Sequence, residues 1–216
     1  MLVYYFRNPE QLSAERLTEL VASLPPQQQE IIARTKNHRQ QCEQTIAYIM
    51  LCHALKTHRH SIASAWNKVI PFHDKLLTSR YVRRNPPLWA FGEHGKPHIT
   101  NYEGIHFNIS HCKEAVAIGI SDREVGIDIE GRRHYSDTLL QRAFCDEEQA
   151  AIKASDDPEK EFASLWTRKE AWFKWTGTGI LLEHLKTTES DAASAGCAIT
   201  TIPIVGSPDF WLSIAQ

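Results

Sequence analysis

The chain has 216 residues, which is enough for one large domain or two small ones. Its hydrophobic residues (42%) and charged residues (23%) are in proportions typical of a globular protein with a buried core. A net charge of -2 gives no reason to expect a nucleic-acid or membrane surface, so we expect neither kind of partner.

Three features of the chain favour a cytoplasmic location. Residues 1–7 are apolar at first, but the run is too short and too soon charged for a signal peptide. No apolar run reaches the roughly 18 residues that span a bilayer. The five cysteines are odd in number and lack Cys-x-x-Cys spacing, which predicts free thiols in a reducing compartment.

The N-terminal part predicts one strand and then helices. Apolar residues recur at helical spacing after Asn8-Pro9, and an Asn cap followed by Pro is typical of a helix start. Pro25-Pro26 opens another short helix. The expected elements, in chain order, are a strand at 3–6, a helix from Pro9 to about Ser23, a helix at 27–32, a helix at 39–56 and a weak helical pattern near 70–81.

The middle of the chain predicts strands. Period-two alternation and short apolar runs between turns are typical of strands. We expect three consecutive strands to form a meander. The elements, in chain order, are an apolar run at 88–91, a loop at 92–99, a strand at 105–109, a turn at 110–114, a strand at 115–120, a turn at 121–124 and a strand at 125–130.

The C-terminal part returns to helices and predicts one last strand. Asp157-Pro158 is another cap followed by Pro, and Gly177 with Gly179 marks a helix end. The elements are helices at 138–144 and 146–154, a stretch from Pro158 leading into a helix at 163–176, and a strand at 210–214. The order of helices and strands predicts an α+β fold.

The strand at 125–130 is acidic. Because strand side chains alternate between faces, Asp128 and Glu130 point one way and Ile127 and Ile129 the other. Two carboxylates about 4 Å apart at moderate dielectric repel by about 4 kcal/mol. Such a pair beside a core strand suggests a cation, and oxygen ligands favour Mg²⁺. An edge strand with solvated carboxylates fits the same residues.

The helix at 163–176 carries a second charged pair. Glu170 and Lys174 stand one turn apart on one face. A surface pair worth about 0.3–0.5 kcal/mol would have the same spacing. Large apolar residues surround the helix, and a helix that is apolar nearly all round is usually buried. The charged residues are therefore expected to line a cleft.

Three other patterns are weaker by themselves. Gly95-Lys96-Pro97 is also a common turn. Ser110 and His111 are neighbours, so on a strand they face opposite ways and do not form a catalytic dyad. We expect them to offer hydrogen bonds to a ligand anion. No His or Cys spacing suggests zinc.

Taken together, these segments resemble the 4'-phosphopantetheinyl transferases of the type that activates surfactin synthetase. Order and spacing agree over roughly residues 92–180. The matching segments are Gly95-Lys96-Pro97, Phe107-Asn108-Ile109-Ser110-His111, Gly126-Ile127-Asp128-Ile129-Glu130, Phe144 with Glu148, and Trp166-x-x-Lys169-Glu170-Ala171-x-x-Lys174-x-x-Gly177-x-Gly179.

The resemblance implies a pseudo-twofold α+β fold whose two similar halves, residues 1–121 and 122–216, enclose CoA and Mg²⁺. It implies transfer of 4'-phosphopantetheine from CoA to a serine of an apo carrier protein, with release of adenosine 3',5'-bisphosphate. The first half would contact the nucleotide of CoA, and the second would carry the metal site and the catalytic helix.

The resemblance also implies roles for individual residues. Asp128, Glu130 and Glu170 match the Mg²⁺ ligands, and Glu170 also matches the proposed general base, acting directly or through water. Lys174 would stabilise charge on the departing bisphosphate. The residues matching other positions are Lys169 as a phosphate contact, Glu148 as a carboxylate near the metal, and Lys96, Pro97, Asn108, Ser110 and His111 as contacts of the nucleotide and its 3'-phosphate.

The N-terminal half departs from the family pattern. Gln40 stands where the family usually has Asp, and Tyr48 stands where its helix carries Arg. Arg39 is the expected grip on the 3'-phosphate, with Arg34 and Thr45 as weaker candidates. These two differences concern the binding of the nucleotide and do not affect Asp128, Glu130 and Glu170.

Two rival functions fit parts of the same pattern. One is a Mg²⁺-dependent phosphohydrolase that cuts CoA or a nucleotide, and the other is a CoA-binding, carrier-docking module without catalysis. The sequence does not identify the carrier protein or its pathway. We expect the carrier protein to dock near Arg132 and Arg133. The length of the chain favours a monomer.

Overall fold

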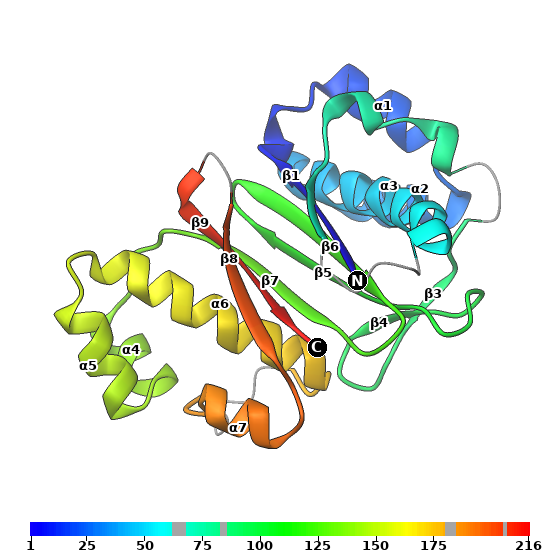
Figure 1. Ribbon diagram of the computed structural model, residues 1–216. Coiled ribbons are helices and arrows are strands. Elements are labelled where there is room, and N and C mark those ends of the chain that lie inside the picture. Colours follow the sequence, from blue (N-terminus) through cyan, green and yellow to red (C-terminus); the bar gives the residue numbers. More distant parts are fainter. Residues whose placement is uncertain (62–67, 83–85, 180–184, 205–206) are drawn as a thin grey trace. The chain divides into compact units, whose positions relative to one another are not determined.

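The computed structural model describes residues 1–61, 68–82, 86–179, 185–204 and 207–216. Its contacts divide the chain into two compact units. Unit 1 comprises residues 1–90 and 97–123, and unit 2 comprises residues 91–96 and 124–216. Each unit combines helices with a largely antiparallel sheet, so the chain is a mixed α and β protein (Figure 1).

Unit 1 is built around a four-stranded sheet with the order β2-β1-β6-β5. Strand β1 pairs in parallel with β2 and antiparallel with β6, and β5 and β6 form an antiparallel hairpin. Its elements are β1 (Leu2–Arg7), η1 (Pro9–Gln11), α1 (Ala14–Ala22), α2 (Pro26–Arg34), α3 (His38–Ser61), β2 (Lys68–Pro71), η2 (Asp74–Leu76), η3 (Ser79–Tyr81), β4 (Pro97–Ile99), β5 (His106–Cys112) and β6 (Ala115–Ser121).

Helix α3 covers one face of this sheet and carries the core of unit 1. Its middle is buried on all sides, with Ile46, Ile49 and Met50 fully enclosed. These residues pack with Tyr4 of β1 and Ile118 of β6 in one hydrophobic cluster. Burial of each such side chain stabilises the fold by about 1.5–3 kcal/mol.

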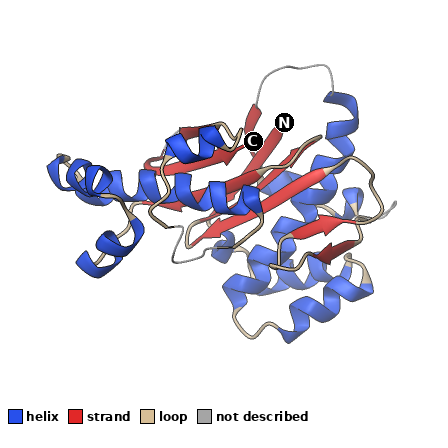
Figure 2. Ribbon diagram, turned by 90° about the horizontal axis from the view of Figure 1, so that it is seen from below, coloured by secondary structure: helices blue, strands red, loops and turns tan. Residues whose placement is uncertain are grey.

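Strand β3 (Trp89–Phe91) forms a separate two-stranded sheet with β4. Figure 2 draws these short strands as a pair of their own. The sequence predicted a loop at 92–99, and the structure instead starts the second strand at Pro97. The turn is closed by hydrogen bonds between Gly92 and Lys96 and between Gly95 and Gly92.

Unit 2 is a long helix packed on a three-stranded antiparallel sheet with the order β7-β9-β8. In Figure 1 helix α6 lies along this sheet. The unit's elements are β7 (Gly126–Gly131), α4 (Asp137–Ala143), α5 (Asp146–Ala154), α6 (Pro158–Thr176), α7 (Glu189–Ser194), β8 (Ile199–Ile204) and β9 (Ser207–Ala215).

Helix α6 ends where the sequence predicted, but it begins at Pro158, before the start expected at residue 163. The Asp157 side chain accepts a hydrogen bond from the Lys160 backbone amide, and Pro158 occupies the first helical position. Gly177 ends the helix with a φ of 71°, a left-handed conformation that glycine adopts without strain. One continuous helix therefore covers the stretch that was expected to lead into 163–176.

The predicted three-strand meander is wrong. Strands β5 and β6 pair as expected, but β7 pairs with β9 in a different sheet, with Asp128 opposite Ser213. The partner strand lies about 85 residues further along the chain. Local alternation shows that a strand has two faces but does not identify the neighbour at its edge.

Other boundaries also differ. Ser110 and His111 lie inside β5, not in a turn, because the β5-β6 ladder continues to the pair Cys112 and Ala115. Asn8 makes no side-chain cap, and Pro9 opens only a short 3-10 helix, while α1 starts later with Ser13 as its cap. The helical pattern near 70–81 corresponds to the end of β2 and two 3-10 turns, and helix α7 and strand β8 were not predicted.

None of the five cysteines, all of which lie among the described residues, forms a disulfide bond, in agreement with the predicted thiols. None of the helices that the structure describes combines the length and the apolar character needed to cross a membrane.

Candidate active site

Strand β7 and helix α6 carry the acidic residues that the sequence singled out, and both belong to unit 2. The Thr167 hydroxyl of α6 donates a 3.0 Å hydrogen bond to the backbone carbonyl of Asp128 in β7. Gly126 allows the two backbones to approach, because a Cβ atom there would overlap Ala171 and Trp175. Close helix–strand contact is therefore what brings the β7 carboxylates to the helix.

Asp128 and Glu130 share one face of β7, as predicted from alternation. Asp128 is 2% exposed, so the solvated edge-strand interpretation does not describe it. Glu130 and Glu170 are partly buried. Burial, followed by the charges of Asp128 and Glu170, raises the pKa of the Glu130 carboxyl to about 7. Burial and the Asp128 charge also raise the pKa of Glu170. The three carboxyl groups therefore share one electrostatic environment.

Lys174 supplies positive charge to this environment. Its Nζ atom lies 2.6 Å from Asp128 Oδ1 and 3.7 Å from Glu170 Oε2. Burial alone lowers the pKa of Lys174, but the neighbouring carboxylates of Asp128 and Glu170 outweigh it and the net shift is upward. Lys174 is therefore held as an ammonium ion between β7 and α6.

Arg133 supplies a second positive charge, which the sequence reasoning had assigned only to a docking surface. Its Nη1 atom lies 3.3 Å from Glu130 Oε1, and its guanidinium lies over the Trp166 ring, 5.6 Å from the ring centroid. Glu130 lies in β7 and Arg133 follows the strand, so the helical i,i+3 rule does not apply and no local signal predicted this pair. The preceding residue, Arg132, instead forms ion pairs with Asp157 and Glu159.

The oxygen atoms of Asp128, Glu130 and Glu170 are of the kind that binds a divalent cation, but they are not arranged around a common point. Carboxylate oxygens are the ligands that Mg²⁺ prefers. Among the residues that the structure describes, however, no group of three or more His, Cys, Asp or Glu side chains has metal-binding geometry. At Asp128 the neighbouring cation is the ammonium group of Lys174.

Lys169 lies next to Glu170 in sequence but makes different contacts. Its Nζ atom lies 2.9 Å from Glu148 Oε2 and donates a 2.6 Å hydrogen bond to the Thr187 carbonyl. Glu148 also accepts a hydrogen bond from the Cys145 backbone amide, at the start of α5. Lys169 and Glu148 line a cavity of about 410 Å³ together with Trp172. The structure thus pairs the two residues directly with each other.

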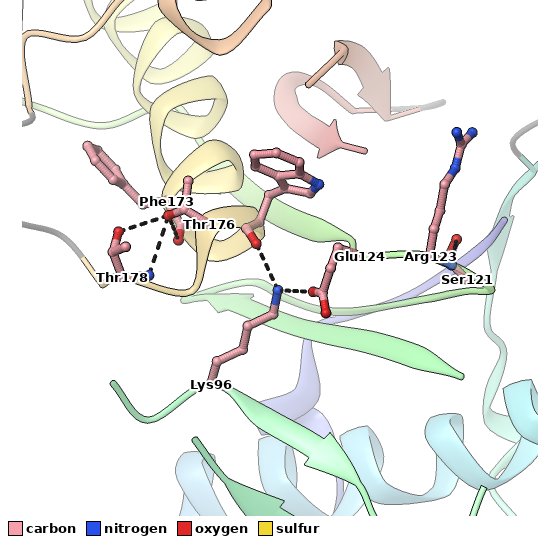
Figure 3. Close-up of polar contacts among 8 residues, drawn as sticks. Lys96, Ser121, Arg123, Glu124, Phe173, Thr176 and Thr178 are labelled. Atoms are coloured by element: carbon pink, nitrogen blue, oxygen red, sulfur yellow. Dashed lines mark hydrogen bonds and ion pairs between the residues drawn. The ribbon is translucent and has the colours of Figure 1, made fainter. Parts of the chain in front are cut away.

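Lys96 lies at the C-terminal end of α6. Figure 3 shows its ammonium group beside Glu124, whose carboxylate it contacts at 2.7 Å. The same ammonium group donates a 3.0 Å hydrogen bond to the Trp175 carbonyl oxygen. A cation is favourable there because the last carbonyl groups of a helix carry partial negative charge. The Lys96 side chain also packs beside Gly177. This position was not foreseen from the Gly-Lys-Pro pattern.

The comparisons with known proteins concern this same unit. A family model of the 4'-phosphopantetheinyl transferase superfamily matches residues 124–207. Residues 124–207 are therefore similar to that superfamily. The match contains β7, α6 and all four residues of the Asp128, Glu130, Glu170 and Lys174 cluster.

Individual relatives carry the same superfamily name. The chain is 36% identical over 92 residues to 4'-phosphopantetheinyl transferase Sfp of Bacillus subtilis (strain 168), covering 42% of this chain and 41% of that protein. It is 36% identical over 97 residues to transferase gsp of Aneurinibacillus migulanus (44% and 40%). It is 36% identical over 109 residues to transferase AcpT of Salmonella typhi (48% and 56%). The chain spans about half the length of these relatives or less.

The nucleotide contacts that the superfamily resemblance predicts in unit 1 lie on α3, β4 and β5. Arg39 Nε is 3.2 Å from Glu43 Oε1, and Glu43 is buried. Asn108 and Ser110 are buried on one face of β5, whereas His111 is exposed on the other. Pro97 begins β4. These roles stay predictions.

Tyr48 and Thr45 of α3, in the region where this chain differs from the family pattern, have structural roles. Tyr48 is a buried core residue whose hydroxyl donates to the Pro87 carbonyl. The Thr45 hydroxyl donates to the Gln41 carbonyl one turn earlier, at 2.7 Å. Glu43 was missed by the sequence reasoning, although its spacing of four residues from Arg39 is that of an ion pair on a helix.

Proposed function

We propose that this chain is a Mg²⁺-dependent 4'-phosphopantetheinyl transferase. It moves the phosphopantetheine group from CoA to a serine of an apo acyl, peptidyl or aryl carrier protein and releases adenosine 3',5'-bisphosphate. The observation that carries this proposal is the Asp128, Glu130, Glu170 and Lys174 cluster, which lies inside the superfamily segment.

The side chains of the cluster divide the chemistry among them. Asp128, Glu130 and Glu170 would hold the ion, and a bound Mg²⁺ supplies positive charge that neutralises the CoA pyrophosphate. Glu170, whose carboxyl has a raised pKa, accepts the proton of the attacking serine hydroxyl, directly or through water. Lys174 donates hydrogen bonds to the departing bisphosphate as its charge develops.

The remaining predicted residues are proposed to bind CoA. The segment up to residue 121 would contact the nucleotide, while residues 122–216 carry the metal site and the catalytic helix. We also keep the pseudo-twofold relation of two halves, the monomeric state and the cytoplasmic location as proposals. The proposed CoA contacts are Arg39, Lys96, Pro97, Asn108, Ser110, His111, Lys169 and Lys174.

Intact-mass spectrometry of carrier proteins tests the proposal. The purified chain is incubated with CoA, Mg²⁺ and a panel of apo acyl, peptidyl and aryl carriers. We expect at least one carrier to gain the mass of one phosphopantetheine group, and we expect EDTA to abolish the gain. A carrier whose acceptor serine is replaced by alanine is the matched control and should not change.

Two other outcomes would contradict the proposal. Release of phosphopantetheine into water without any carrier would indicate a phosphohydrolase. CoA binding without transfer to any carrier, while an active transferase modifies the same panel, would indicate a binding module.

A further inference from the structure

Lys174 lies where the proposed metal ion would need to be bound. Its ammonium group contacts Asp128 on the strand at 2.6 Å and Glu170 on the helix at 3.7 Å. It therefore bridges two of the three carboxylates that are expected to hold Mg²⁺. The third carboxylate, Glu130, has Arg133 beside it at 3.3 Å.

The charges explain why the Lys174 ammonium group is stable between these carboxylates. Lys174 and Arg133 together offset two of the three formal negative charges of the carboxylates. A divalent ion added at Asp128 would lie within a few ångströms of the ammonium group, and like charges at that distance repel strongly in a partly buried site. An ammonium on a flexible four-carbon chain can leave, whereas the backbone of β7 cannot.

We propose that Lys174 is the internal counter-ion of Asp128 and Glu170, and that a divalent cation competes with its ammonium group for these carboxylates. The free protein therefore binds divalent ions weakly as long as Lys174 remains on Asp128. This inference rests on the proposed function for the identity of the metal ligands. It adds that Lys174 acts on metal affinity as well as on the leaving group.

Mn²⁺ titration followed by electron paramagnetic resonance tests the competition. The full chain is titrated without CoA or carrier protein, as the wild type and as the Lys174→Met and Lys153→Met variants. Lys153→Met makes the same charge change on an exposed lysine in the last turn of α5. We expect Lys174→Met to bind Mn²⁺ at least 10-fold more tightly than the wild type, and Lys153→Met to bind as the wild type does. Equal or weaker binding by Lys174→Met would overturn the proposal.

A second measurement uses the wild type and does not depend on the folding of a variant. Brief labelling with acetic anhydride, followed by peptide mass spectrometry, measures how fast each lysine amine is acetylated. We expect acetylation of Lys174 to become several-fold faster when saturating Mg²⁺ is added, because the ion frees its amine, and acetylation of Lys153 to stay unchanged. An unchanged or slower rate at Lys174 would overturn the competition.

Both measurements omit CoA and carrier protein. The competition can therefore fail while phosphopantetheine transfer is observed, and it can hold while no carrier is modified. The two proposals are thus tested separately.

Discussion

The hydroxyl group of Thr167 donates a 3.0 Å hydrogen bond to the backbone carbonyl of Asp128. Both residues are buried, and the bond joins the middle of α6 to the strand that carries the acidic residues. The turn of α6 that follows Thr167 holds Glu170, and the next holds Lys174. This contact therefore helps to set which helix positions face Asp128.

Thr167→Val should destabilise the protein because valine keeps the volume and removes the hydroxyl donor. We expect the free energy of unfolding to fall by about 1–3 kcal/mol, as for loss of a buried hydrogen bond. Urea unfolding measures the change. Thr18→Val is the control, since Thr18 is exposed and its hydroxyl bonds within its own helix. Equal effects of the two substitutions would contradict a special role for Thr167.

Gly126→Ala should disrupt the packing of α6 on β7. The new Cβ atom would overlap the backbone of Ala171 and Trp175, and backbone atoms of a packed helix cannot rotate away. We expect a loss of about 3 kcal/mol or more in the free energy of unfolding. Gly92→Ala is the control, because its Cβ atom would make an ordinary 3.5 Å contact with Lys96. A Gly126→Ala protein as stable as Gly92→Ala would show that the helix can shift at no cost.

Asp128→Asn should reduce carrier modification while the protein stays folded. The amide keeps the size of the side chain but removes the charge that faces Lys174 and the proposed metal ion. We expect kcat/KM to fall by about 100-fold or more, as for loss of an electrostatic catalytic group. Circular dichroism checks the fold, and Asp156→Asn at an exposed position is the control. A rate within about twofold of the wild type would remove Asp128 from the proposed site.

Glu43→Gln should change how stability depends on pH. Burial raises the pKa of the Glu43 carboxyl above its ordinary value of 4.5, and the charges of His111 and Arg39 offset this only in part. The folded state therefore holds this proton more tightly than the unfolded state does. The resulting stabilisation is fully present below pH 4.5 and is lost as pH rises through the folded pKa.

The pH effect is measured by thermal unfolding of the wild type and Glu43→Gln between pH 4 and pH 8. We expect the stability of the wild type relative to the variant to decrease as pH rises. Glu30→Gln, at an exposed position on α2, is the matched control and should show no such trend. A difference between wild type and Glu43→Gln that grows in the opposite direction would contradict the burial of an unfavourable charge at Glu43.

Most elements with a strong local signal were predictable. The Asp157-Pro158 start and the Gly177 end of α6 depend on caps that residues make with their immediate neighbours, and the structure has both. The alternation of β7 correctly placed Asp128 and Glu130 on one face. The prediction failed at Pro9, because an Asn-Pro pair can open either an α-helix or a short 3-10 helix. It also failed at Ser110 and His111, because pairing with β6 extends β5 through these residues.

The sequence predicted which residues belong to the candidate site better than it predicted which of them contact each other. The spacing of Glu170 and Lys174 required them to be one turn apart, and the structure confirms their contact. The contact of Lys174 with Asp128 could not be read in the same way, because it joins residues that are 46 positions apart. Lys96 at the end of α6 and the Lys169–Glu148 pair are likewise products of packing between distant segments.

The sequence by itself determined which residues carry charge, which face of a strand or helix they share, and the similarity of residues 124–207 to the superfamily model. These properties follow from backbone periods of 2 and 3.6 residues, which act over a few neighbouring positions. Only the tertiary structure decided that β7 pairs with β9 and that the ammonium group of Lys174 lies on Asp128. Such contacts depend on which distant apolar faces pack together, and no local pattern specifies that choice.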